Sequence, residues 1–134
     1  MTRSFAEEGD GFAVVSNILH VTRVNNSGAA FGLMHGQAPL LVWVSALGLL
    51  FFAFFFLKRG IRSGSRLAET GTALVMGGTL GNLYDRLRYG YVIDFIDLRV
   101  WPVFNIADSA ITVGIGLLAI YLIKEDRSRA SHIH

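Results

Sequence analysis

The chain has 134 residues, of which 52% are hydrophobic and only 16% charged, with a formal net charge of +2. This composition and a mean hydropathy of +0.48 argue against a soluble globular domain and favour a membrane protein. Cysteine is absent, which excludes disulfides, thiolate catalysis and cysteine-ligated zinc. The small excess of Lys and Arg lies mostly at the ends of apolar runs, which favours membrane topology over nucleic-acid binding.

Residues 1–37 are expected to form an extracytoplasmic, β-rich segment. The stretch from Val14 to Val24 is rich in β-branched residues and ends at the turn-prone NNSG, which predicts one strand followed by a turn. Arg23 interrupts its apolar run, and acids precede it, so it provides neither a membrane span nor a signal peptide. We therefore expect a small sheet that lies on the bilayer.

Three segments are long and apolar enough to cross a bilayer, which takes about 20 residues. Residues 38–57 contain no charge, whereas residues 66–85 reach full length only with Glu69 near one membrane face and Asp85 near the other. Residues 104–123 carry Asp108 close to their start. The sequence thus predicts a single, mainly α-helical membrane domain with three transmembrane helices.

The distribution of Lys and Arg predicts the orientation of these spans. The loop over residues 58–66 carries four cations, and the tail over residues 124–134 adds Lys124, Arg127 and Arg129. We expect the loop and the tail in the cytoplasm. The connection between the second and third spans then faces outward, which gathers four acids at the outer membrane surface: Asp85, Asp94, Asp97 and Asp108.

Each of these acids has a structural interpretation beside a catalytic one. Asn105 or Asp108 can cap the third helix, and Asp85 can pair with the adjacent Arg86. Asp94, however, lies among apolar residues. If a second carboxylate lies beside it there, the two cannot both ionise easily and would share one proton, which is the arrangement that an aspartic protease uses. The residues alone leave both Asp97 and Asp108 open as its partner. A serine or cysteine nucleophile paired with histidine is not indicated.

Small and aromatic residues add two further expectations. Gly77, Gly78 and Gly81 have the spacing that lets helices pack closely, and they lack the sequence context of a phosphate-binding loop. Trp43 and Trp101 are expected to anchor span ends at the membrane interface.

Four ordered blocks resemble the signature of the bacterial lipoprotein signal peptidases, also called signal peptidase II. They are NNSGAAFGL, GGTLGNLYDR, VIDF and FNIADSAI, and the resemblance extends from about Phe12 to Ile123. It implies that Asp94 and Asp108 form a catalytic dyad, with Asp85 in support and Asp97 a bystander. It also implies a set of substrate-binding residues: Asn26, Asn82, Arg86 and Asn105.

The resemblance further implies a monomeric aspartic endopeptidase of the bacterial inner membrane, with its site at the extracytoplasmic face and no metal or cofactor. Its substrate would be a prolipoprotein, cut before the diacylglyceryl-modified cysteine. Family members usually have four spans, and we expect the first to be missing here. The alternative is therefore an impaired homologue that binds lipopeptide without turnover. An ion carrier is disfavoured because the acids cluster at one face.

Overall fold

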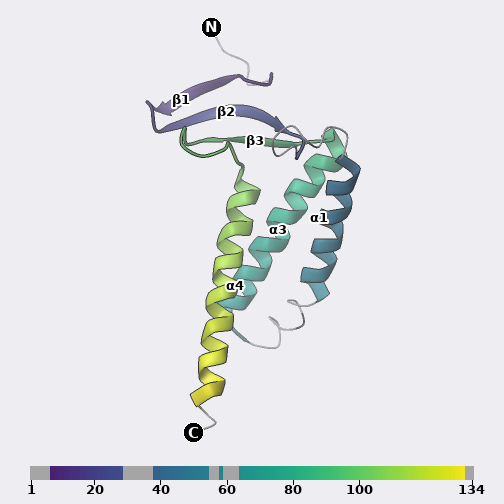
Figure 1. Ribbon diagram of the computed structural model, residues 1–134, viewed down its shortest axis with the longest axis vertical. Coiled ribbons are helices and arrows are strands. Elements are labelled where there is room, and N and C mark those ends of the chain that lie inside the picture. The colour runs from purple at the N-terminus through teal and green to yellow at the C-terminus, as the bar shows by residue number, and fades with distance from the viewer. Residues whose placement is uncertain (1–6, 29–37, 55–57, 59–63, 132–134) are drawn as a thin grey trace.

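The computed structural model describes residues 7–28, 38–54, 58 and 64–131. The elements in chain order are β1 (Gly11–Val15), β2 (Leu19–Asn26), α1 (Ala38–Phe52), α3 (Arg66–Tyr89), β3 (Val92–Asp97) and α4 (Ile106–Ser131). The helices run side by side, and the sheet lies across one end of them (Figure 1). The predicted combination of helices and a small sheet is therefore confirmed. Parts of the predicted N-terminal segment, first span, cationic loop and tail lie outside the described residues.

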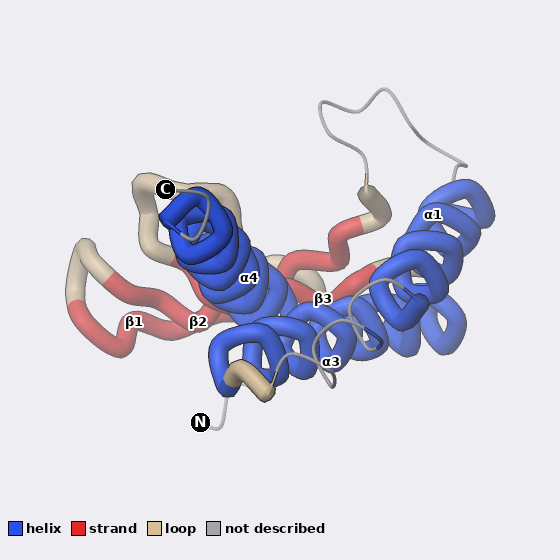
Figure 2. Tube along the Cα trace, turned by 90° about the horizontal axis from the view of Figure 1, so that it is seen from below, coloured by secondary structure: helices blue, strands red, loops and turns tan. Residues whose placement is uncertain are grey.

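Helix α3 lies between α1 and α4 and packs against both (Figure 2). A Cβ atom at Gly78 would clash with the carbonyl of Ala107, and one at Gly114 would lie 2.7 Å from the carbonyl of Gly71. Glycine thus allows the backbones of α3 and α4 to approach each other closely. The prediction of close packing is confirmed for Gly78 and is wrong for Gly77, which faces open space.

The ends of α3 follow from local sequence signals. Gly90 adopts a left-handed conformation, with φ of 81°, and its N–H donates to the carbonyl of Arg86. This glycine cap ends the helix four residues beyond the predicted Asp85, because the acid does not interrupt helical hydrogen bonding. Glu69 in the first turn and Arg86 in the last turn both complement the helix dipole.

The N-terminal segment forms a hairpin where one strand was predicted. Asn17, with φ of 61°, sits in a turn closed by a hydrogen bond from the Ile18 N–H to the Val15 carbonyl. Asparagine tolerates this left-handed conformation, so the β-branched run folds back on itself. The prediction of a single strand from Val14 to Val24 is therefore wrong. The sheet is antiparallel throughout, in the order β1-β2-β3.

Burial in this protein is inverted relative to a soluble domain. Large apolar side chains point outward, among them Leu47 at 62% exposure and Leu87 at 68%. The buried residues of the described part include several polar ones: Thr72, Asn82, Asp94, Asp97 and Asn105. An apolar exterior of this extent is typical of helices that face lipid.

Among the described residues, one helical stretch, Ile106–Ala130, is long and apolar enough to cross a membrane. The apolar stretch Pro39–Phe52 in α1 is shorter. The count of three spans therefore stays a prediction.

Candidate active site

Strand β3 connects α3 to α4 and carries the most deeply buried acid of the described chain. Asp94 is 1% exposed. In an extended strand, side chains two residues apart share a face, so Asp94 lies on the same side of β3 as the buried Val92. Because β3 is the strand nearest the helices (Figure 1), this acid occupies the junction between sheet and helices.

The first turn of α4 brings the second acid to the same junction. Asn105 precedes the helix, and its side-chain oxygen accepts the Asp108 N–H at 2.9 Å. In return, Asp108 Oδ2 accepts the Asn105 N–H at 3.1 Å. This reciprocal pair is a capping box, with Asp in the position that Glu commonly takes. The capping interpretation from the sequence is confirmed, and it holds the Asp108 carboxylate in one orientation.

Two asparagine side chains connect the acids. The Asn105 Nδ2 group donates one hydrogen to Asp94 Oδ1 at 2.8 Å and the other to Asn82 Oδ1 at 3.0 Å. Asn82 Nδ2 then donates to Asp108 Oδ1 at 2.9 Å. Asn82 and Asn105 are both buried, so this network is shielded from competing water. We call these four residues, Asp94, Asp108, Asn82 and Asn105, the carboxylate network.

Asn26 approaches the network from the sheet. It is the last residue of β2, and its Nδ2 donates to Asp94 Oδ2 at 2.9 Å. Its side-chain oxygen accepts the Gly28 N–H at 2.8 Å, which holds the amide in a turn. Both oxygens of Asp94 therefore accept hydrogen bonds from neutral amides, one at the end of β2 and one in the residue before α4.

The surroundings of Asp94 favour its protonated form. Burial is the main cause that raises its pKa, and the nearby charge of Asp108 raises it further. Hydrogen bonds from Asn26 and Asn105 and the positive charge of Arg86 act in the opposite direction. The net result is a raised pKa, so Asp94 holds its proton to a higher pH than an exposed aspartate.

Asp85 and Arg86 lie at the sheet end of α3 and make separate contacts. Asp85 Oδ2 accepts the backbone N–H of Ile93 at 3.1 Å, directly beside Asp94 in β3. Arg86 Nη1 donates to Ser45 Oγ on α1 at 3.1 Å, whereas its Nε is buried with no hydrogen-bond partner. The prediction that Asp85 forms an ion pair with Arg86 is therefore wrong. Asp85 accepts a backbone N–H from β3, and Arg86 donates to a side chain of α1.

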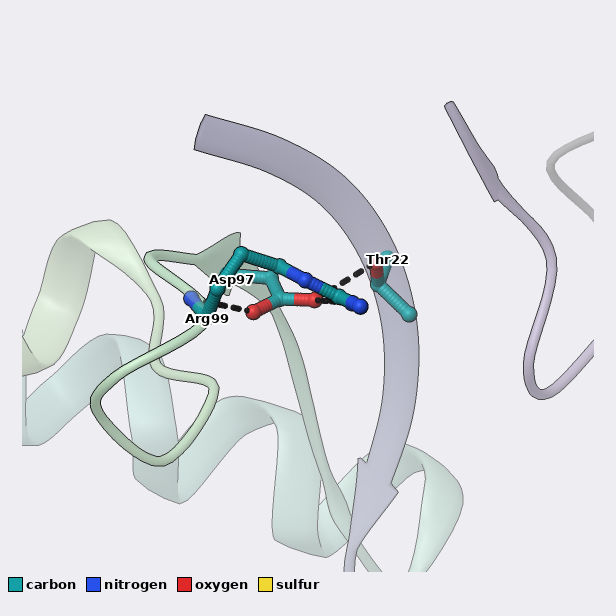
Figure 3. Close-up of polar contacts among 3 residues, drawn as sticks. All are labelled: Thr22, Asp97 and Arg99. Carbon is teal, nitrogen blue, oxygen red and sulfur yellow. Dashed lines mark hydrogen bonds and ion pairs between the residues drawn. The ribbon is translucent and has the colours of Figure 1, made fainter. Parts of the chain in front are cut away.

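Asp97 lies apart from the carboxylate network. It is three residues beyond Asp94, an odd separation that places the two side chains on opposite faces of β3. It is nevertheless buried, at 6% exposure. Thr22 and Arg99 donate hydrogen bonds to its carboxylate (Figure 3). The geometry excludes Asp97 as the partner of Asp94 and gives it contacts that the term bystander does not cover.

An open groove of about 420 Å³ borders the network on the α4 side. Asp108 is one of its lining residues, and the others come from the loop after β3 and from α4 and are mostly apolar: Leu98, Trp101, Phe104, Ser109, Thr112 and Val113. Within the described part of the chain, no three His, Cys, Asp or Glu side chains gather closely enough to hold a metal ion. The arrangement thus offers two carboxylates beside an apolar surface.

The structure brings six of the seven predicted site residues into direct or adjacent contact, and it places Arg86 close enough to influence the charge of Asp94. Sequence reasoning missed Ser45, Thr22 and the groove. The sequence did contain one signal for the position of Asp97. If VIDFID is predicted to be a strand, Asp94 and Asp97 fall on opposite faces of it.

Comparisons with known proteins point to one family. A family model described as signal peptidase (SPase) II matches residues 1–124. A lipoprotein signal peptidase of Halothermothrix orenii is 38% identical over 118 residues, which cover 88% of this chain and 79% of that protein. A lipoprotein signal peptidase of Syntrophomonas wolfei is 46% identical over 117 residues, covering 87% and 76%.

Two solved structures have the same fold. Both are described as bacterial membrane enzymes crystallised in meso, at 2.3 and 1.9 Å resolution. Each superposes with a TM-score of 0.76. They are 33% and 34% identical to this chain, and the matches cover 90% and 88% of it, and 74% and 77% of the solved chains.

Proposed function

This chain belongs to the signal peptidase II family, and from this premise we propose that it is an aspartic endopeptidase acting on bacterial prolipoproteins. It cleaves the signal peptide before the diacylglyceryl-modified cysteine. The observation that carries the proposal is the joining of Asp94 and Asp108 by shared asparagine amides at the buried junction of sheet and helices. Two carboxylates linked through one buried network can act as an acid and a base that share one proton.

The two acids differ in ways that assign their roles. Asp94 is buried and has a raised pKa, so it keeps the shared proton. Asp108 lies in the first turn of α4 and borders the open groove, and both of its carboxylate oxygens accept hydrogen bonds. Asp108 is therefore the base, which takes a proton from the attacking water. Asp94 is the acid, which donates its proton to the carbonyl oxygen as the tetrahedral intermediate forms.

The surrounding polar residues hold the dyad and the substrate. Asn82 and Asn105 use their amide hydrogens within the network, so they fix the carboxylates in place. Arg86 retains a buried Nε without a partner, and we assign it to a carbonyl of the bound peptide. Asp85 supports the site by anchoring the backbone of Ile93 next to Asp94, and Asn26 orients Asp94 from the sheet.

The distribution of charge supports a multi-pass protein of the inner membrane with its site at the extracytoplasmic face. Arg66 begins α3 at the helix end remote from the sheet, and Lys124, Arg127 and Arg129 lie in the last turns of α4. By the positive-inside rule this end faces the cytoplasm. A site at the outer interface suits a substrate whose acyl chains stay in lipid while its peptide bond is cut.

The test is cleavage of a diacylated prolipoprotein by the purified full chain in detergent or lipid. Asp94→Asn and Asp108→Asn are each expected to lower kcat by at least 1,000-fold, because each removes one half of the proton transfer. Asp126→Asn, an equal change at an exposed position of α4, is the matched control and should retain activity. Full activity in both dyad variants would overturn the proposal.

A further inference from the structure

We propose that Asp97 is a positioning residue, which holds the loop over residues 98–104 as one wall of the groove beside Asp108 and thereby sets how the apolar part of the substrate is seated. This inference rests on the proposed function and extends it to a residue outside the carboxylate network. Its carrying observation is a three-way contact among Thr22, Asp97 and Arg99, drawn from β2, β3 and the loop (Figure 3).

The Asp97 carboxylate uses both oxygens in this contact. Oδ1 accepts the backbone N–H of Arg99 at 2.8 Å, and Oδ2 accepts Thr22 Oγ1 at 3.1 Å and Arg99 Nη1 at 3.2 Å. The register of β2 shifts between Val21 and Val24, which inserts an extra residue opposite β3. A bulge of this kind redirects side chains, and Thr22 lies within it.

The backbone of the loop adopts an unfavourable conformation at one residue. Arg99 has φ of 65°, a left-handed conformation that side chains other than glycine, asparagine and aspartate rarely adopt. The Arg99 N–H that Asp97 accepts belongs to this residue, so the carboxylate stabilises the turn where it is most strained. Loss of Asp97 would leave the turn without its main polar support.

The far end of the loop is fastened separately. Phe104 exchanges two backbone hydrogen bonds with Ile96, at 2.8 and 3.1 Å, and its carbonyl also accepts the Phe95 N–H. The loop therefore begins at the Asp97 contact and returns to β3 at this bridge. With both ends fixed, the side chains between them have a defined position.

These side chains form the wall. Leu98, Trp101 and Phe104 come from the loop, and they line the groove together with Asp108 and other residues of α4. The chemistry of the wall selects hydrocarbon, which a prolipoprotein offers either as an acyl chain on its cysteine or as apolar side chains before the cleavage site. In both cases Asp97 acts through the wall and makes no contact with the reacting atoms.

The kinetic experiment varies the substrate. Asp97→Ala is expected to raise KM at least 5-fold, to change kcat less, and to weaken the preference for apolar over polar substrate groups. Shortening the acyl chains in one arm, and replacing the apolar residues before the cysteine in the other, identifies which hydrocarbon the wall contacts. A uniform fall in kcat with unchanged KM and preference would overturn the inference.

Asp126→Ala is the matched control, because it makes the same side-chain change at an exposed position of α4. It is expected to retain KM within about 2-fold of the parent protein. Asp97→Asn serves if the alanine variant does not fold, and it is expected to raise KM by a smaller factor. A parent-like KM in Asp97→Asn, with Asp97→Ala unfolded, also contradicts the inference.

A second measurement does not depend on cleavage. The chain has two tryptophans, so Trp43→Phe leaves Trp101, on the wall itself, as the single tryptophan for selective excitation. Asp97→Ala in this background is expected to shift the Trp101 emission and its quenching by brominated lipid, whereas Asp108→Asn is not. Unchanged fluorescence would overturn the inference even if prolipoprotein is cleaved, and a shift without any cleavage would overturn only the proposed function.

Discussion

Asn105 and Asp108 cap the same helix reciprocally, each accepting the other's backbone N–H. The structural and the catalytic interpretations of these residues are therefore not alternatives. The hydrogen bonds that begin α4 are the ones that orient the carboxylate, and the remaining amide hydrogens of Asn105 reach Asp94 and Asn82. Helix initiation and site assembly thus depend on one side chain, which leads to the first prediction.

Substitution of Asn105 should separate capping from assembly of the site. Asn105→Ala removes both, and we expect it to cost about 1 kcal/mol of stability for the cap and to lower kcat at least 100-fold. Asn105→Ser retains a capping oxygen but has no amide to bridge Asp94 and Asn82. It should unfold near the parent temperature and still lose most activity. Thermal unfolding and cleavage assays check both, and parent-like activity in Asn105→Ser would contradict the proposed bridging role.

The raised pKa of Asp94 predicts how stability depends on pH. Below the ordinary aspartate pKa of about 3.9, the folded and unfolded states both hold the proton, and the stabilising contribution is complete. As pH rises toward the raised folded pKa, only the folded state still holds it, so stability falls. Asp94→Asn cannot titrate. The unfolding temperature of the parent should therefore fall relative to Asp94→Asn as pH rises from about 4, and a constant difference would contradict this.

Asp85 should affect activity through the backbone of β3. Asp85→Ala leaves the Ile93 N–H without its acceptor, which we expect to cost about 1–3 kcal/mol and to lower kcat by displacing Asp94. Asp85→Asn keeps an acceptor oxygen, and it should recover most of both losses. Unfolding and kinetics of the two variants provide the measurement. If the asparagine variant is as inactive as the alanine variant, the charge of Asp85 matters more than its hydrogen bond.

Adjacent glycines provide a matched pair for the α3–α4 contact. Gly78→Ala places a methyl group against the Ala107 carbonyl, one residue before Asp108, and overpacking of this kind costs about 1–3 kcal/mol. Gly77→Ala enters open space and should be neutral or stabilising by up to about 1 kcal/mol. We expect lower activity and unfolding temperature for Gly78→Ala alone. Equal effects of the two substitutions would show that the close approach of the backbones is unimportant.

The apolar helices and the gathering of acids could be predicted from the sequence because both depend on the composition of short, continuous segments. The choice of Asp108 over Asp97 came from family resemblance, and the structure explains it through the alternation of side chains along β3. Recognising VIDFID as a strand would have been enough to exclude Asp97 as the partner of Asp94. It was overlooked because its acids break the apolar pattern that marks a buried strand.

Other features were beyond local sequence reasoning. The hydrogen bond from Arg86 to Ser45 joins residues 41 positions apart, and that from Thr22 to Asp97 joins residues 75 apart. Such contacts follow from the packing of α1 on α3 and from the register of β2 on β3. The hairpin turn at Asn17 was missed because one left-handed residue within a β-branched run is a weak signal.

The hydrogen bonds of the carboxylate network all lie at the sheet end of the helices, and this has a consequence for the surrounding lipid. Helix α4 has 26 residues, or about 39 Å at about 1.5 Å per residue, which exceeds the hydrocarbon thickness of about 30 Å. In thinner or thicker bilayers the mismatch is taken up by tilt and by the cationic end of α4, where side chains can extend to the headgroups. In the proposed orientation, we expect Asp94 and Asp108 to keep their depth in one leaflet as the bilayer thickness changes.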